Sequence, residues 1–257
     1  MSKNFELLRQ AGFKQNYFGD VRTETPPAEK INAPVGSPST ARYRAPNAPA
    51  QDDQISALVR KIFLDGRNPN VHSVVFSGVA PSAGCTWACA QTGTTLANMV
   101  DGTVCLVDAN FAAPAINRQF GQDNAVGFSD AILQGKPARN FARQIDGSNL
   151  YVLSAGEEGV RLEPDGAGAN VARCLRELRR DFDYLLVDAP PLAGSSTAST
   201  AGRAGDGAIL VLESTGIALE SLLKAKQHLK AARVPLFGVV LNGRKSPAHS
   251  LFGQFFK

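Results

Sequence analysis

The feature that most constrains the fold of this chain is a glycine-bearing loop between two apolar segments. Residues 71–76 predict a strand, and residues 87–100 predict a helix. The loop between them, residues 77–86, reads Ser-Gly-Val-Ala-Pro-Ser-Ala-Gly-Cys-Thr. The backbone N–H groups of such a loop and the positive end of the following helix converge on one point and favour an anion. This stretch therefore predicts a phosphate-binding loop.

The loop departs from the phosphate-loop pattern at one position. That pattern reads G-x-x-x-x-G-K-[ST], and here Gly84 and Thr86 fit it, whereas Cys85 stands where the lysine should be. A cysteine removes the positive charge, and a thiolate at this position would repel phosphate. Two interpretations follow, a working nucleotide site or the remains of one.

The rest of the chain alternates strand and helix patterns. Apolar strands are predicted at residues 103–108, 150–154, 184–188, 208–212 and 236–241, and helices at 51–63, 127–135, 171–180 and 218–232. This order predicts the α/β class, a P-loop NTPase-like and mostly parallel sheet with helices on both faces. In such sheets the ligand lies at the carboxyl edge of the strands, where Asp108, Asp188 and Asn242 would join the loop.

The first fifty residues differ in character from the remainder. Residues 1–20 predict a short N-terminal helix or tail, and residues 21–50, with six prolines, predict a flexible linker. Residues 51–257 form the predicted globular domain. Its twenty Lys and Arg nearly balance its nineteen Asp and Glu, which argues against a nucleic-acid surface.

Hydropathy and cysteine usage indicate the compartment. No apolar stretch is long enough to span a bilayer, and the N-terminus lacks a signal core, so we expect a cytoplasmic protein. The four cysteines lie in helix or strand patterns, which fits reduced thiols better than disulfides. Cys85 and Cys89 could form a metal or redox pair, but packing at a helix start is favoured because no further Cys or His has ligand spacing.

Several stretches together resemble a known family. They are Pro81-x-x-Gly84-x-Thr86, Leu106-Val-Asp108-Ala-Asn110 with Pro114, Phe120-Gly121, Gly127-Phe-Ser-Asp130, Tyr151-Val-Leu-Ser-Ala-Gly156, Asp183-Tyr-Leu-Leu-Val-Asp188-Ala-Pro-Pro191 and Gly238-Val-Val-Leu-Asn242-Gly243. This order resembles the bacterial tyrosine kinases of capsule and exopolysaccharide systems, of the CpsD/CapB type and the Wzc-like cytoplasmic domain. These kinases are part of the wider group of MinD/ParA-like phosphate-loop ATPases. The match covers about residues 51–243.

The resemblance implies a role for each matching residue. ATP or ADP with Mg²⁺ would be the cofactors, Asp108 and Asp188 would be catalytic, and Thr86, Asp108 and Asp188 would hold the metal. The implied nucleotide-binding residues are Pro81, Ser82, Ala83, Gly84, Cys85, Thr86 and, at the adenine, Asn242. The implied partner is a membrane chain-length or polysaccharide co-polymerase protein, which would recruit the chain to the inner face of the membrane. A homo-oligomer is also implied.

Four departures from the family pattern concern charge and phosphorylation. Cys85 replaces the lysine, and the second acidic motif reads Asp-Ala-Asn from Asp108, without its second aspartate or following basic residues. The oligomerisation helix keeps only Arg60 of its Glu-x-x-Arg-x-x-Arg pattern, and residues 252–257 contain no tyrosine. These departures favour a kinase-like regulator with weakened or lost activity. An active autokinase with a rearranged site stays open, as does a positioning ATPase of the MinD/ParA kind.

Overall fold

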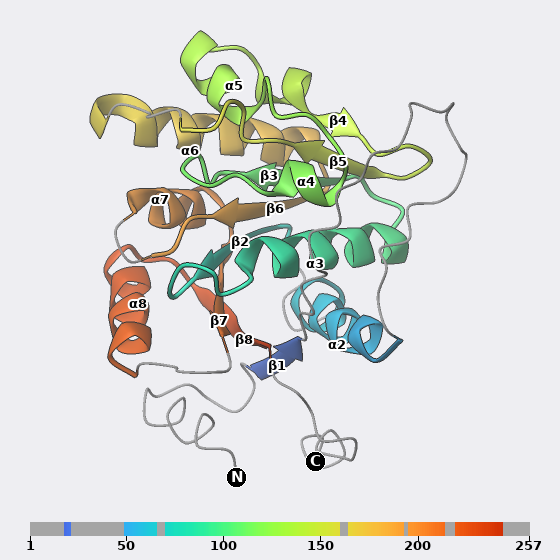
Figure 1. Cartoon of the computed structure of the whole chain (residues 1–257), viewed down its shortest axis with the longest axis vertical. Helices are drawn as coiled ribbons and strands as arrows, with labels where there is room; N and C mark the ends of the chain where they lie inside the picture. The colour runs from blue at the N-terminus through green and yellow to red at the C-terminus, as the bar shows by residue number, and fades with distance from the viewer. Residues whose placement is uncertain are drawn as a thin grey trace, which may run out of the picture.

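The computed structural model describes residues 18–21, 49–65, 70–159, 164–192, 195–213 and 219–243 (Figure 1). Residues 1–17 of the predicted N-terminal helix or tail, most of the predicted linker and residues 244–257 lie outside the described residues. The described residues form a sheet with helices on both faces, which confirms the predicted fold class.

The sheet has eight strands in the order β1-β8-β7-β2-β6-β3-β5-β4. The strands are β1 (Phe18–Val21), β2 (Ser73–Gly78), β3 (Val104–Asp108), β4 (Arg143–Gln144), β5 (Leu150–Leu153), β6 (Tyr184–Ala189), β7 (Gly207–Glu213) and β8 (Leu236–Asn242). All neighbouring strands pair in parallel except β4 and β5. The predicted parallel core is therefore present, with one antiparallel strand at an edge.

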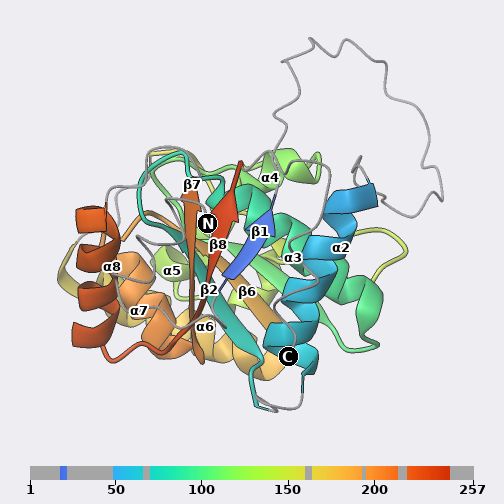
Figure 2. The same cartoon turned by 90° about the horizontal axis from the view of Figure 1, so that it is seen from below.

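The helices divide between the two faces of the sheet. They are α2 (Pro49–Val59), which continues into one π-helical turn (Arg60–Leu64), α3 (Cys85–Met99), α4 (Ile116–Gln119), α5 (Phe128–Gln134), a 3-10 turn (Ala138–Phe141), α6 (Pro164–Asp181), α7 (Ser196–Ala204) and α8 (Leu219–Ala231). Helices α2, α3 and α4 pack on one face, and α5, α6, α7 and α8 pack on the other (Figures 1 and 2).

The central apolar strands contribute side chains to the hydrophobic cores on both faces of the sheet. Along β2, Val74 and Phe76 join the core beneath α2 and α3, whereas Val75 joins the core beneath α6 and α7. Successive side chains of a strand point to opposite faces, so a strand covered on both sides must be apolar at every position. This explains why the central strands read as continuous apolar runs.

The pairing register brings the polar strand ends to one edge. Asp108 at the end of β3 pairs with Asp188 of β6, and Ser77 of β2 pairs with Ala189 of β6. The loop after β2 therefore begins beside both aspartates, as the sequence predicted for the carboxyl edge.

Candidate functional site

The loop between β2 and α3 is fixed by close backbone contacts. A Cβ on Gly78 would lie 2.7 Å from the Ala80 carbonyl oxygen, so only glycine fits at this position. The Val79 N–H donates to the Val211 carbonyl at 3.0 Å, and the Gly78 carbonyl accepts from the Leu192 N–H at 3.2 Å. The start of the loop is thus bound to β7 and to the segment after β6, and it is held there before any ligand arrives.

The loop ends in a helix start with free amides. Ser82 and Gly84 adopt left-handed backbone conformations with φ of 61° and 78°, and α3 begins at Cys85 without a side-chain cap. The first N–H groups of a helix have no intrahelical partner, and they carry the positive end of its dipole. This arrangement forms a cradle of backbone amides from residue 82 to residue 86, whose geometry suits an anion, and phosphate binding by these residues stays a prediction.

Thr86 and Asp188 form a buried polar pair beside the cradle. The Thr86 hydroxyl donates to Asp188 Oδ2 at 2.6 Å. Asp188 is 1% exposed, and its other oxygen, Oδ1, has no hydrogen-bond partner among the described residues. Burial, followed by the charge of Asp108, raises the pKa of Asp188 to about 7. A buried carboxylate oxygen without a partner is costly, so it marks a place for a cation or a donor.

Asp108 lies next to Asp188 but is directed to its own loop. Its Oδ2 accepts from the N–H groups of Ala115 and Ile116 at 2.9 and 3.0 Å, and its Oδ1 accepts from Asn110 at 3.0 Å. Burial raises its pKa, against the lowering effect of these three bonds. The structure therefore gives Asp108 the task of ordering residues 110–116, while its charge still acts on Asp188. Its catalytic and metal-binding roles stay predictions.

Cys85 presents a neutral thiol rather than a thiolate. Burial, together with the nearby charge of Asp188, raises its pKa well above the usual value, and Cys89 is shifted upward for the same reasons. The repulsive thiolate considered for this position therefore does not form at neutral pH. What the loop lacks is the positive charge of a lysine.

The side chains of Asn242 and Ser77 form hydrogen bonds that fix the loop and its start. The Asn242 side-chain amide donates to the Ala83 carbonyl at 2.9 Å, and its Oδ1 is buried without a partner in the described residues. The Ser77 hydroxyl donates to the Pro190 carbonyl at 2.8 Å. The adenine contact expected of Asn242 stays a prediction. Ser77 was not singled out from the sequence, where a single serine at a strand end carries no signal.

A cation of α4 acts on Asp108. The charge of Arg118, in α4, lowers the pKa of Asp108 and so opposes the effect of burial. Arg118 is exposed and lies 3.8 Å from Glu158, a pair that solvent screens. No local pattern singles Arg118 out, because it lies ten positions beyond Asp108 and the intervening segment folds back onto that carboxylate.

The donor set of this site suits a hard cation bound together with phosphate. Thr86 offers a hydroxyl and Asp188 a free oxygen, and Mg²⁺ prefers oxygen ligands while keeping waters and phosphate oxygens. Among the described residues, no group of three or more His, Cys, Asp or Glu is placed to hold a metal. The site therefore fits Mg²⁺ carried by a nucleotide better than a metal held by protein ligands alone.

Comparison with known proteins finds relatives among bacterial tyrosine-protein kinases. No family model matches the chain. It is 26% identical over 187 residues to the tyrosine-protein kinase YwqD of Bacillus subtilis, covering 71% of this chain and 77% of that protein. It is 31% identical over 94 residues to the tyrosine-protein kinase CpsD of Streptococcus pneumoniae, covering 37% of this chain and 41% of that one. These relatives confirm the resemblance found in the motifs.

Solved structures share the fold at lower identity. The chimerical protein CapA2B2 superposes with a TM-score of 0.75 at 19% identity, covering 94% of this chain and 99% of that one. The kinase domain of Escherichia coli tyrosine kinase ETK gives 0.74 at 19% identity, with 98% and 99% covered. The Pyrococcus furiosus cell division ATPase MinD gives 0.57 at 21% identity, with 66% and 71% covered. In the part of the chain that the structure describes, no helix has the length and hydropathy needed to cross a bilayer.

Proposed function

We propose, from the chain's kinship with bacterial tyrosine-protein kinases, that it is a nucleotide-binding, kinase-like regulator of capsular or exopolysaccharide biosynthesis and export. Its phosphoryl-transfer activity would be weakened or lost. The observation that carries this proposal is a phosphate loop complete in its backbone and in its Thr86–Asp188 pair, but with a neutral thiol where the cation is needed.

The roles at the site follow from the geometry. The amides of residues 82–86 bind the β- and γ-phosphates of ATP or ADP, and Pro81 and Ala83 shape the turn that presents them. Thr86 and the free oxygen of Asp188 hold Mg²⁺, directly or through water. Bound Mg²⁺ supplies the charge neutralisation that phosphoryl transfer requires.

The missing lysine limits transfer more than binding. Phosphoryl transfer depends mainly on positioning and charge stabilisation, and removing one preorganised donor costs about 10²–10³ in rate. Binding retains the amides, the helix dipole and the metal. The site therefore favours a protein that responds to nucleotide over one that turns it over quickly.

An active autokinase is the second candidate, and Arg118 is the observation that favours it. Its charge acts on Asp108, and in this candidate a movement of α4 would bring it to the phosphates in place of the loop lysine. Of the four tyrosines, Tyr151 and Tyr184 lie in strands and are half-buried. Tyr43 and Tyr17 lie outside the described residues and are the better substrates on sequence grounds.

The partner and location follow from the same kinship. A membrane chain-length or co-polymerase protein would recruit the chain to the inner face of the membrane. Self-association would use α2 and the π-helical turn that continues it, where Arg60 is exposed. Sedimentation that shows self-association for the wild-type chain and none for a charge-reversed Arg60→Glu variant would support assembly through this segment. Co-purification with the membrane protein tests docking separately.

Calorimetric titration with ADP tests the nucleotide site. We expect weak binding that strengthens with Mg²⁺, and we expect Thr86→Ala to remove the Mg²⁺ dependence while leaving the fold intact. Absence of heat at millimolar nucleotide would contradict the assignment. Mass spectrometry after incubation with Mg·ATP distinguishes the two candidates: phosphotyrosine that disappears in Asp188→Asn or Arg118→Gln would establish the autokinase.

A further inference from the structure

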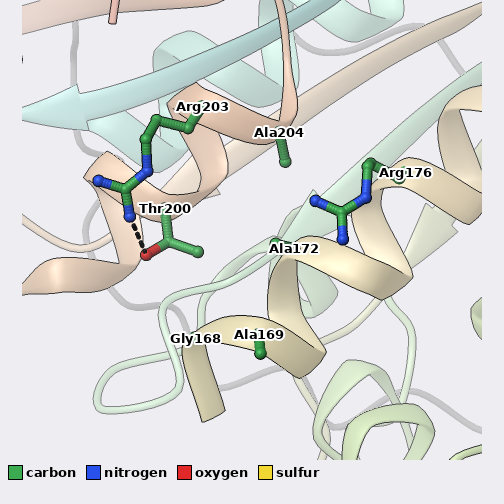
Figure 3. A pocket seen from close by; sticks show the side chains of 7 residues that line it. All are labelled: Gly168, Ala169, Ala172, Arg176, Thr200, Arg203 and Ala204. Carbon is green, nitrogen blue, oxygen red and sulfur yellow. Dashed lines mark hydrogen bonds between the residues drawn. The ribbon is translucent and has the colours of Figure 1, made fainter. Parts of the chain in front are cut away.

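A cavity lined by small residues and two arginines lies away from the phosphate loop, between α6 and α7 (Figure 3). Its volume is about 340 Å³. Its lining is Gly168, Ala169, Ala172 and Arg176 of α6 with Thr200, Arg203 and Ala204 of α7. Both helices cover the face of the sheet opposite α3, so the cavity shares no residue with the loop site.

Small side chains create the space. The two helices approach closely where Gly168 meets Thr200, since a Cβ on Gly168 would lie 3.7 Å from the Thr200 hydroxyl oxygen. Ala169 and Ala172 continue this wall along α6, and the nearly buried Thr200 and Ala204 form the side from α7. These small side chains therefore leave a cavity between the two helices.

Two arginines of different helices provide the charge. Figure 3 shows Arg176 on α6 and Arg203 on α7 at two sides of the cavity, with the Arg203 guanidinium directed toward Thr200. Both arginine side chains are exposed. Arg203 donates to the Thr200 hydroxyl at 3.3 Å, which orients its guanidinium. Arg176 makes no hydrogen bond or ion pair with any described residue. No acidic side chain among the described residues lines the cavity.

The neighbouring acids are already engaged by other arginines. Glu177 accepts from Arg173 at 2.7 Å, and Asp206 pairs with Arg179 and also accepts from the N–H groups of His72 and Ser73. These pairs leave the two cavity arginines without a counter-charge from the described part of the chain. Two guanidinium groups that no described acidic side chain neutralises, at one cavity, favour a ligand that brings negative charge.

We propose that this cavity binds the phosphate group of a small phosphate monoester. Such a group carries about −1.5 to −2 charges near neutral pH, which matches the two guanidinium groups. Arginine forms bidentate hydrogen bonds to phosphate, and the Thr200 hydroxyl adds a further donor. The volume lies at the lower end of the range of small-molecule sites. It suits a compact metabolite rather than a folded partner.

Residue-resolved NMR with glycerol 3-phosphate as the probe tests the proposal in the full chain. We expect saturable shifts of the amides of Ala169, Ala172, Thr200 and Ala204. The amides of Gly84 and Thr86 report separately on the phosphate loop, so binding there is not confused with binding in the cavity. Acetate serves as a carboxylate ligand for comparison, and we expect it to shift the same amides only at much higher concentration. Equal affinity for acetate would overturn the preference for phosphate.

Matched variants complete the test. Arg176→Gln and Arg203→Gln should each weaken binding about tenfold or more, because each removes charge-assisted hydrogen bonds. Arg180→Gln removes the same charge from the same helix but outside the cavity, and it should change affinity little. Ala169→Leu fills the exposed mouth without altering charge and should also abolish the shifts. Equal weakening by Arg180→Gln, or no saturable shift at these amides, would overturn the proposal.

Discussion

Two features of Asp188 disfavour its ionised form in the free protein. It is buried at the sheet edge next to a second carboxylate, and one of its oxygens has no hydrogen-bond donor within the described residues. Its pKa is raised to about 7, so near neutral pH the free protein holds a proton there for part of the time. A bound cation would displace that proton, which couples metal binding to pH.

The pH dependence of stability follows from this shift. An acid whose pKa is higher in the folded state than in the unfolded state favours unfolding once both states ionise. Between about pH 4 and pH 7 the folded chain keeps a proton that the unfolded chain releases, so the free energy of unfolding falls as pH rises. The shift corresponds to roughly 4 kcal/mol at most.

Asp188→Asn removes this titration and keeps an oxygen for Thr86. We expect thermal unfolding at pH 8 to occur at a higher temperature in the variant than in the wild type, with the difference shrinking toward pH 4. Cys174→Ser, a buried thiol on the far side of the sheet, serves as a control without this pH profile. A pH-independent difference for Asp188→Asn would contradict the argument.

Cys85→Lys tests the consequence of the missing charge. The lysine would reach bound phosphate and form charge-assisted hydrogen bonds worth about 1.5–3 kcal/mol, so ADP affinity should rise about tenfold or more. Cys85→Met adds length without charge and should not raise affinity. Equal affinities of the lysine and wild-type proteins in calorimetry would place the phosphates elsewhere.

Sequence and structure agree best where a residue's role is local. Gly84 and Thr86 were identified because the phosphate-loop spacing is a local pattern, and Asp188 because it ends an apolar strand. The bonds from Asn242 to Ala83 and from Ser77 to Pro190 join residues more than 100 positions apart. No local pattern encodes such pairings, so they required the fold.

At the scale of elements, two motifs that the sequence analysis listed separately, residues 127–130 and residues 151–156, are joined by hydrogen bonds. The Phe128 and Ser129 N–H groups at the start of α5 donate to the carbonyls of Ser154 and Ala155 after β5, each at 2.8 Å. Asn124 bonds to the backbone of Gly156, and Asp130 accepts from the Gly127 N–H at 2.8 Å. The two stretches therefore have a structural role, which is to join the start of α5 to the segment after β5.

Gly127→Ala should disrupt this connection. A Cβ there would lie 2.1 Å from the Ser154 carbonyl oxygen, so the helix or the strand end must shift, at a cost of about 1–3 kcal/mol. Chemical denaturation measures the loss. Gly135→Asn is the matched control, because its left-handed turn has open space around it and asparagine tolerates that conformation. Comparable losses in both variants would refute the close-approach argument.

Helices with large apolar residues were predicted well, and small-residue helices were not. The helix expected at residues 127–135 is observed as α5 (Phe128–Gln134), and that at 218–232 as α8 (Leu219–Ala231). Helix α7 reads Ser-Thr-Ala-Ser-Thr-Ala-Gly-Arg-Ala, without periodic large side chains, and was missed. The Ser195 hydroxyl, which accepts from the Thr197 N–H at 3.2 Å, was its available signal.

At the scale of the whole molecule, the interior of the sheet was predictable and its edges were not. The six strands that carry continuous apolar runs all appear, because burial on both faces leaves a strong pattern. Strands β1 and β4 are short and lie at the two edges, with β4 antiparallel. Edge strands gain little from side-chain burial, so they need no continuous apolar run and are hard to recognise in the sequence. Residues 18–21 were thus expected to be tail and linker.

The edge strand β1 leads to a prediction about truncation. Its four residues pair in parallel with Val239 to Asn242 of β8, directly beside the asparagine that holds the phosphate loop. From the sequence alone, residues 1–50 would be dispensable. Because β1 closes the edge of β8, we instead expect a chain that begins at residue 22 to unfold more easily, by about 2 kcal/mol for the lost backbone hydrogen bonds, and to aggregate through the exposed edge. A chain that begins at residue 18 keeps β1 and should resist both effects better. Thermal melting with light scattering compares the two, and equal behaviour would mean that β1 contributes nothing to the stability of the domain.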